Sequence, residues 1–453
     1  MHVVNTPKGH SNIDATQRGK VHHVSTPQPN ISPAAGLFAD PRFKPNAYPI
    51  YAHLRANDPI SSMPLQDGST MWFVARYDDA VAVLRDHARF SNDPTTIFPP
   101  EMLEARYATL LGHLTPEQVA TVVEVDQSIS RNLLGVDPPD HIRLRSLVSK
   151  GFTPRYVEAL RPRIQQITDE RISEMRRQAE ANDGVVDLLT NFAFPLPLQV
   201  ITEMLGIPIE MRDEFRDWSN AAVEFNPMTP GDIDLNARLL AFVRYVRTLI
   251  AEKRETPGDD LVSLLVQAEE AGDRLTEQEL IGMIFILIVA GHETTVNLIG
   301  NGLLALLDHP DQLALFCAQP ELAKNAIEEL LRYAGPVEAS LPRWVREDTE
   351  FAGVHFRKGD QVMPILASAD RDTALLSEPD RLDITREPTR HLAFGQGIHV
   401  CLGMPLARLE GQIALTSLLA AYPRISLAIP REEIPYRVGF LLRATGEIPV
   451  RLG

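Results

Sequence analysis

The residues best suited to chemistry lie in the segment AFGQGIHVCLG, residues 393–403, which holds Cys401, one of only two cysteines in the chain. A thiolate acts as a nucleophile or as a metal ligand. A nucleophile needs a base supplied from elsewhere in the fold, and zinc needs three or four ligands, for which no Cys or His pair lies at finger spacing. Axial ligation of haem iron needs a single cysteine. The simpler alternative is a buried structural cysteine.

The residues around Cys401 favour the ligand interpretation. Gly395, Gly397 and Gly403 carry no side chain, so a flat macrocycle can lie close to the loop backbone. A helical pattern, residues 402–422, follows directly and predicts that the cysteine lies at a helix N-terminus, where the helix dipole and free amide groups stabilise an anion. The segment matches five positions of one motif: Phe394, Gly397, His399, Cys401 and Gly403.

This motif resembles the haem-binding loop of cytochrome P450 monooxygenases of the soluble bacterial type, and the resemblance extends from about Leu37 to the end of the chain. It implies a mainly α fold with a minor β portion and a long central helix over haem b. Cys401 would be the metal ligand, and the electrons would come from NAD(P)H through a separate ferredoxin or flavodoxin. The loop residues that the resemblance assigns to cofactor binding are Phe394, Gly395, His399, Cys401 and Gly403.

A second motif, AGHETT at residues 290–295, lies inside the longest apolar helical pattern. Burying a carboxylate is costly, so Glu293 needs a reason to be there. A threonine in a helix can simply bond back to the preceding turn, and this is the interpretation given to Thr295. The resemblance assigns Glu293 and Thr294 to catalysis, the first as a proton relay and the second as the group that holds bound oxygen and its water. It also implies that Ala290 and Gly291 leave room for dioxygen.

The EELLR motif places Glu329 and Arg332 three apart on one helix face, within reach of each other. An exposed pair of this kind is ordinary and contributes little stability. The resemblance gives the pair a structural task instead. Together with Arg386 it would brace the cysteine loop, so its loss should abolish haem incorporation.

Haem carries two propionates, for which arginine is a good geometric match. His141 and Arg145 lie four apart on one face of the helix predicted near residues 137–152, and Arg343 follows the EELLR helix. Arg143 is interpreted as a solvated surface charge. The residues that the resemblance assigns to propionate binding are His141, Arg145, Arg343 and His399.

Several segments must position these residues. Helical patterns are expected over residues 153–181, 276–308 and 320–335. Thr153 is the expected N-cap of the first, and Thr276 with Glu279 forms the expected capping box at the start of the second. Alternating polar and apolar residues predict short strands at both ends of the chain: 59–64, 71–76, the stretch after Arg343, and 436–450.

The substrate pocket should be apolar and built from variable segments. Glu338 lies in one of them, where it would contact the substrate or face solvent. A redox partner is expected on the thiolate side, at Arg390, His391 and Arg408. The pocket segments are residues 92–137, the FNPMTPG turn at 225–231, 286–290 and 337–341.

The chain has 453 residues and a formal net charge of −16, which argues against nucleic-acid or anionic-membrane binding. Residues 1–33 are polar and are expected to form a disordered extension with no membrane anchor, ahead of a single haem domain, 34–453. The low cysteine content fits a reducing cytoplasm. A monomer is the default expectation.

The expected function is insertion of one atom of dioxygen into a hydrophobic small molecule, by hydroxylation or epoxidation of a natural product such as a terpenoid, steroid, fatty acid or polyketide. A peroxygenase or isomerase on the same fold is one alternative. Such branches tend to lose the acid and threonine pair, which is present here as Glu293 and Thr294. A non-catalytic haem sensor is the other, and it would need no proton relay.

Overall fold

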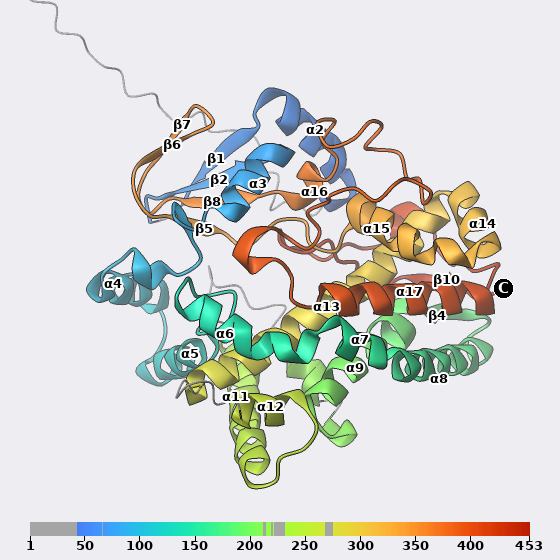
Figure 1. Ribbon diagram of the computed structural model, residues 1–453, viewed down its shortest axis with the longest axis horizontal. Helices are drawn as coiled ribbons and strands as arrows, with labels where there is room; N and C mark the ends of the chain where they lie inside the picture. The colour runs from blue at the N-terminus through green and yellow to red at the C-terminus, as the bar shows by residue number, and fades with distance from the viewer. Residues whose placement is uncertain (1–42, 66, 212–213, 219–220, 222–231, 268–274) are drawn as a thin grey trace, which may run out of the picture. The chain divides into compact units, whose positions relative to one another are not determined.

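The computed structural model describes residues 43–65, 67–211, 214–218, 221, 232–267 and 275–453. The expected N-terminal extension (1–33) and the FNPMTPG turn (225–231) lie outside these residues. The described part is mainly helical with a small sheet portion (Figure 1), so the predicted fold class is confirmed.

The helices are α2 (Ala47–Asn57), α3 (Tyr77–Arg85), α4 (Pro100–Leu111), α5 (Pro116–Ile129), α6 (Asp140–Val148), α7 (Pro154–Ala159), α8 (Arg161–Glu180), α9 (Pro195–Leu205), α11 (Ile233–Glu255), α12 (Leu261–Gln267), α13 (Glu277–Asp308), α14 (Pro310–Ala318), α15 (Ala323–Ala334), α16 (Leu366–Ala369) and α17 (Met404–Ala421). The strands are β1 (Ile60–Pro64), β2 (Thr70–Val74), β3 (Phe90–Ser91), β4 (Val185–Asp187), β5 (Arg343–Val345), β6 (Thr349–Phe351), β7 (Val354–Phe356), β8 (Gln361–Pro364), β9 (Ser426–Leu427) and β10 (Pro449–Arg451).

Helix α13 runs through the middle of the helical part (Figure 1). The predicted capping box at its start is confirmed: the Glu279 amide donates to Thr276 Oγ1 (3.2 Å) and the Thr276 amide donates to the Glu279 carboxylate (2.9 Å). Within the described residues α13 alone is long and apolar enough to cross a membrane, yet 72% of its apolar window is buried inside the protein. Such burial is typical of the core helix of a globular protein.

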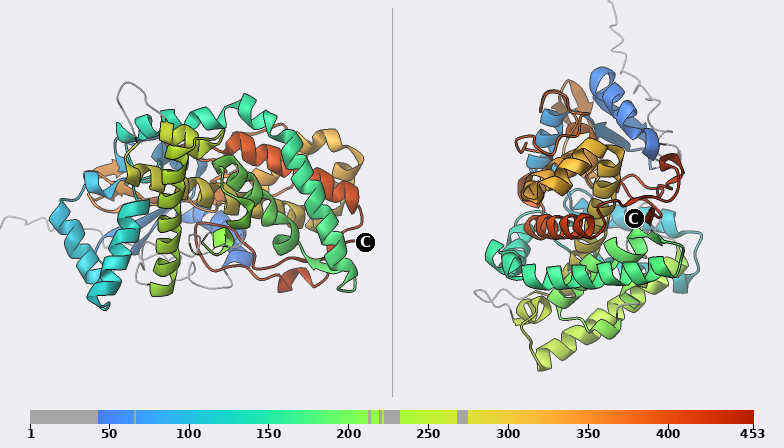
Figure 2. Two further views of the ribbon diagram at one scale, coloured as in Figure 1. Left: turned by 90° about the horizontal axis from the view of Figure 1, so that it is seen from below. Right: turned by 90° about the vertical axis from the view of Figure 1, so that its right-hand side faces the viewer.

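Helix α13 packs against α5, α9, α15 and α17. Helix α17, which follows the cysteine loop, lies between α15 and α8 in the right-hand view of Figure 2. The end of the cysteine loop is therefore held by helices from both halves of the chain.

The main sheet joins the two ends of the chain, as predicted, in the order β1-β2-β8-β5-β3. Strands β2 and β8 are parallel, with Met71 opposite Gln361, and the other neighbours are antiparallel. Helices α2, α3 and α16 lie beside this sheet (Figure 1). A second sheet, β4-β10-β9, pairs the C-terminal strand with the segment after α8.

Three local expectations differ from the structure. The helix expected over 153–181 breaks at Leu160 into α7 and α8, because Pro162 has no amide proton to continue it. The helix expected over 320–335 begins with a 3-10 turn, and α15 starts at Ala323. The strand expected at 436–450 is mostly a looser C-terminal hairpin, residues 434–446, because part of its backbone bonds to a neighbouring segment: the Arg443 amide donates to the carbonyl of residue 336, and the Glu338 amide donates to the Leu441 carbonyl.

Candidate active site

The loop that carries Cys401 folds back on itself and ends at a helix N-terminus. The Cys401 amide donates to the Phe394 carbonyl (2.9 Å), and α17 begins three residues after the cysteine. The sulfur accepts hydrogen bonds from the backbone amides of Gly403 and Met404. Burial raises the pKa of the Cys401 thiol, whereas these two amides and Arg145 act in the opposite direction. The surroundings thus supply the donors that stabilise a metal-bound thiolate.

The three glycines of the loop serve different purposes. Gly397 has a φ of +77°, and a Cβ there would lie 2.4 Å from the carbonyl oxygen of Leu84, so this glycine allows the loop to contact α3 rather than a macrocycle. A Cβ at Gly395 would meet open space, with the His399 carbonyl oxygen 4.0 Å away. A Cβ at Gly403 would lie 4.0 Å from the Cys401 sulfur. Gly395 and Gly403 therefore leave the surface beside the sulfur clear for a flat ligand.

The four residues assigned to propionates are brought together from separate segments of the chain. The rings of His141 and His399 meet edge to face at 4.4 Å, and both Arg145 and Arg343 act electrostatically on His399. Arg343 is 3% exposed and donates to the backbone carbonyls of residues 83 and 84. Arg145 donates to the carbonyl of Ile398 (3.2 Å).

The polar and cationic groups of this cluster have few hydrogen-bond partners and little counter-charge in the surrounding protein. Both ring nitrogens of His141 lack a hydrogen-bond partner among the described residues, and His399 has only a weak interaction with the Leu133 backbone. Burial lowers the pKa of His141 to about 4, of His399 to about 3 and of Arg343 to about 10, although Asp137 opposes it at His141 and Arg343. Buried cations are unfavourable without sufficient counter-charge, so a ligand with two carboxylates fits the cluster.

The same residues fit haem and its iron. No three His, Cys, Asp or Glu side chains gather into a metal site in the part of the chain that the structure describes. Haem, which brings its own nitrogen ligands for the iron, would be held here by the Cys401 thiolate. The open glycine surface would contact the ring, and the cationic cluster would bind its propionates.

Helix α13 borders an open space at one turn. Ala290 is exposed, and Gly291 and Thr294 are partly exposed, although the helix is buried on both sides of this turn. Thr294 Oγ1 donates to the Ala290 carbonyl (2.6 Å), and Thr295 Oγ1 donates to the Gly291 carbonyl (3.3 Å). Both hydroxyls thus bond back to the preceding turn. The Thr294 oxygen can still accept a hydrogen bond from a ligand in the open space.

Glu293 is buried on a different side of α13 and is paired. It is 3% exposed, and its Oε1 accepts from Arg437 Nη1 (3.3 Å) and from Asn297 Nδ2 (3.3 Å). Burial raises the pKa of Glu293, while Arg437 and Asn297 lower it. The adjacent His292 is buried too and packs edge to face on Phe194 at 4.3 Å. Glu293 is therefore an acid whose proton affinity is set by opposing effects.

The EELLR pair is buried rather than exposed. Arg332 is 2% exposed and forms a bidentate ion pair with Glu329, Nε to Oε2 at 2.7 Å and Nη2 to Oε1 at 2.8 Å. Arg386 Nε reaches the same Glu329 oxygen, Oε1, at 3.3 Å. The Arg332 guanidinium also donates to the backbone carbonyls of residues 370, 379 and 381. The pair and Arg386 therefore tie α15 to the segment that leads into the cysteine loop.

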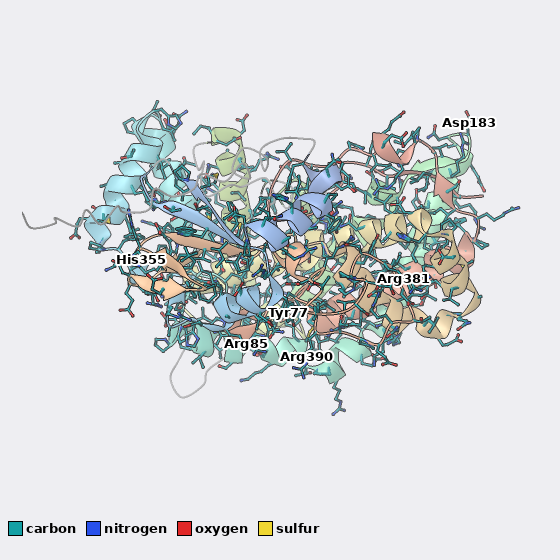
Figure 3. All side chains as sticks on the ribbon, turned by 90° about the horizontal axis from the view of Figure 1, so that it is seen from above. Tyr77, Arg85, Asp183, His355, Arg381 and Arg390 are labelled. Atoms are coloured by element: carbon teal, nitrogen blue, oxygen red, sulfur yellow. The ribbon has the colours of Figure 1, made fainter. Side chains whose placement is uncertain are left out.

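The residues expected to meet a redox partner divide into two kinds. Arg408 forms a bidentate pair with Glu328 (2.6 Å for both bonds), and His391 also bonds to Glu328 (3.2 Å). Although burial opposes it, these bonds lower the pKa of Glu328 to about 2. Arg390 is exposed, and Figure 3 shows it near Tyr77 and Arg85, both of which lie on α3.

Two interpretations of single residues were wrong. Glu338 neither contacts a substrate nor faces solvent, because it is fully buried and pairs with Lys44 and Arg443 (3.4 Å to Arg443). Arg143 is not a solvated charge: its side chain is 22% exposed and pairs with Glu279 and with Asp140. In each case a partner more than a hundred residues away decides the outcome.

A further buried acid, Glu410 of α17, was missed in the sequence. It is 1% exposed, interacts with the Thr295 hydroxyl, and its Oε2 has no hydrogen-bond partner within the described residues. Burial raises its pKa to about 8, against the effect of Thr295. The signal that could have found it is a lone acid on the apolar face of the helical pattern 402–422.

Glu410→Gln should make the protein's stability less dependent on pH. Between the ordinary pKa of 4.5 and the folded value of about 8, the folded state holds a proton that the unfolded state lacks. Stability contributed by this group therefore falls as pH rises, by up to about 1.4 kcal/mol per pH unit. The Tm advantage of the variant over the wild type should grow from about pH 5 to about pH 8. Glu433→Gln, at an exposed position, should show no such trend, and parallel curves for Glu410→Gln would contradict the raised pKa.

Comparison with known proteins agrees with this geometry. A family model described as Cytochrome P450 matches residues 318–435. The chain is 42% identical over 412 residues to a vitamin D(3) 25-hydroxylase of Pseudonocardia autotrophica, which covers 91% of this chain and 95% of that protein. It is 40% identical over 437 residues to the cytochrome P450 monooxygenase PikC of Streptomyces venezuelae, with 96% of each covered. The solved structure of PksS, a bacillaene polyketide synthase cytochrome P450 of Bacillus subtilis 168, matches with a TM-score of 0.81 and 39% identity over 91% of this chain and 99% of that one. The chain therefore belongs to the cytochrome P450 family and is a haem-iron monooxygenase.

Proposed function

We propose that this protein hydroxylates or epoxidises a hydrophobic natural product, with Cys401 as the residue that would hold the haem iron and with Glu293 and Thr294 holding and moving protons. The observation that carries the proposal is the accessible turn of α13, Ala290 to Thr294, in a helix that is otherwise buried. An open space beside a hydroxyl and next to a buried acid suits proton delivery. Haem, when bound, would supply electron transfer and the activation of dioxygen.

The protein's own residues would have three tasks. Cys401 would hold the iron, with its charge stabilised by the amides at the start of α17. Thr294 would hold a water by its hydroxyl, and a proton that leaves Thr294 would be replaced through Glu293. The propionates would be bound by His141, Arg145, Arg343 and His399.

Two exposed apolar side chains support an apolar substrate. Leu341 and Val438 are large apolar residues that are 41% and 73% exposed, and they belong to the segments flanking Glu338 and the C-terminal hairpin. The acid in that region, Glu338, is already neutralised by Lys44 and Arg443 and so offers no charge to a substrate. By their names, one relative hydroxylates vitamin D(3) and another belongs to a polyketide synthase, which supports a bulky natural product of the steroid or polyketide class as the substrate here.

The remaining properties are proposed on the same basis. NAD(P)H would supply electrons through a ferredoxin or flavodoxin, with exposed Arg390 among the contacts on the cysteine side. The protein would be a cytoplasmic monomer. Residues 34–453 would form a single haem domain behind the extension formed by residues 1–33.

Substrate titration of the purified holoprotein tests the substrate class. We expect macrolactones and steroids to displace iron-bound water and shift the Soret band towards the high-spin position, and fatty acids to do so more weakly. With a ferredoxin, its reductase and NADPH, the bound compound should gain one oxygen atom from labelled dioxygen. Label from water alone, or turnover that needs only hydrogen peroxide, would contradict the monooxygenase chemistry proposed for this site.

Thr294→Ala should uncouple electron use from product formation. The variant keeps the helix and the haem contacts but loses the hydroxyl that faces the open space, so we expect normal substrate binding and about 10- to 100-fold less product per NADPH, with the electrons recovered as hydrogen peroxide. Thr295→Ala is the matched control, because that hydroxyl is buried against Glu410. Unchanged coupling in Thr294→Ala would refute the role of its hydroxyl.

A further inference from the structure

We infer that Arg437, on the C-terminal hairpin, is a positioning residue that orients Glu293 and tunes its proton exchange during oxygen activation. The inference rests on the proposed function of Glu293 and adds to it a residue from a part of the chain far from α13. Arg437 Nη1 lies 3.3 Å from Glu293 Oε1, and 144 residues separate the two.

The hairpin that carries Arg437 is held firmly at its base. The Arg437 amide donates to the Ala444 carbonyl (2.9 Å), Tyr436 pairs with Thr445, and the Gly446 amide donates to the carbonyl of residue 435 (2.7 Å). These bonds fix where the arginine leaves the backbone. A long side chain from a fixed backbone can hold a carboxylate in one orientation.

A second arginine ties the same hairpin to the protein core. Arg443 is 7% exposed, pairs with fully buried Glu338 (3.4 Å) and donates to the Lys44 carbonyl (3.0 Å). Its guanidinium lies over the rings of residues 48 and 436, both tyrosines, at 4.7 Å and 5.0 Å. The hairpin is thus anchored through Arg443, while the Arg437 side chain, on the opposite strand of the hairpin, is 43% exposed. Arg437 can therefore move without loosening the anchor.

Among the groups around Glu293, Arg437 is the charged side chain that acts on its carboxyl group. Asn297 and His292 come from α13 itself, and the first bonds to Glu293. Arg216, in the described segment 214–218, acts electrostatically on His292 rather than on Glu293. Its guanidinium lies 5.0 Å from the ring centre of Phe194, the residue directly before α9. Burial favours the protonated carboxyl and Arg437 favours the carboxylate. With Arg437 close, the Glu293 carboxyl group can release its proton, and the electrons of the broken O–H bond stay on the carboxylate. The carboxylate can then take a proton back from water.

The hairpin also carries an exposed apolar side chain directly beside Arg437. Val438 follows Arg437 directly in the sequence, and the residue is 73% exposed. Among the large apolar residues that the structure describes, it is the most exposed. A substrate that packs against Val438 would move or fix the neighbouring arginine. Proton exchange at Glu293 would then respond to whether the substrate is present.

The test compares Arg437→Gln and Arg437→Lys with Arg451→Ala in the haem-loaded protein. Arg451 is an exposed arginine of the same C-terminal region that donates to the Asp183 carbonyl (3.2 Å), and it is not among the groups that act on Glu293, so it is the matched control. We expect Arg437→Gln to lower product per NADPH about 3- to 10-fold and to raise the solvent isotope effect, with Arg437→Lys restoring most of the coupling and Arg451→Ala behaving as wild type.

A second readout does not depend on turnover. The infrared carbonyl stretch of the protonated Glu293 carboxyl, identified as the band lost in Glu293→Gln, is followed against pH. In Arg437→Gln its midpoint should move up by about one pH unit or more. Midpoint and coupling both unchanged in Arg437→Gln would overturn the inference. If Glu293→Gln itself couples normally, the proposed relay fails instead, and the two failures are distinguishable.

Discussion

Cys401→Ser will lack the strongly red-shifted Soret band that the dithionite-reduced, carbon monoxide-bound wild type should show, and it will lose almost all monooxygenase activity. Serine keeps the size of the side chain but replaces a thiolate, a strong electron donor to iron, by a hydroxyl that stays protonated at neutral pH. The amides of Gly403 and Met404 would then face a weak acceptor. We expect at least about a 1000-fold loss of turnover, because the thiolate assists oxygen–oxygen bond cleavage.

Cys317→Ser is the control for this experiment. Cys317 is the other cysteine of the chain and is exposed on α14. Its replacement should leave the spectrum and the turnover of the protein unchanged. Wild-type turnover by Cys401→Ser, or the loss of the red-shifted band in Cys317→Ser, would show that the iron ligand has been assigned to the wrong residue.

Arg332→Ala is expected to give little holoprotein. The substitution leaves the Glu329 carboxylate buried without its bidentate partner and frees three backbone carbonyls that the guanidinium now satisfies. Breaking a buried ion pair on one side costs about 3–5 kcal/mol, which is a large part of the stability of a typical domain. The haem-to-protein ratio and the yield of folded protein measure the effect.

Arg381→Ala is the matched control for Arg332→Ala. Its side chain is 58% exposed, labelled in Figure 3, and pairs with Glu378 at the same spacing of three residues. An exposed pair contributes about 0–1 kcal/mol, so haem loading should stay close to that of the wild type. A stable, fully loaded Arg332→Ala protein would refute the bracing role proposed for Glu329, Arg332 and Arg386.

Local features of the fold could be predicted because their causes are local. The capping box at Thr276 and Glu279 needs only two side chains and their own backbone, and the structure contains it. The cap at Thr153 likewise depends on its own turn. The strands at both ends of the chain were predicted from alternation, although their pairing partners could not be named from one sequence.

The parts of the site that escaped prediction depend on distant partners. Glu338 looks like a pocket residue until Lys44, 294 residues earlier, is seen beside it. Arg437 has no motif at all and is noticed only through its contact with Glu293. The Glu329–Arg332 pair is important because it is buried, but a spacing of three residues is the same whether the pair lies on the surface or in the core. A single sequence carries the spacing but not the neighbours.

The parallel pairing of β2 with β8 also orders events in time as the chain is made. The Thr70 amide bonds to the Asp360 carboxylate, which lies 290 residues further along. A ribosome that adds about 5–20 residues per second needs roughly 15 to 60 s for that length. Throughout that interval β2 has an unpaired edge open to other nascent chains. Because Cys401 is synthesised later still, the cofactor can be captured only when nearly the whole chain has emerged.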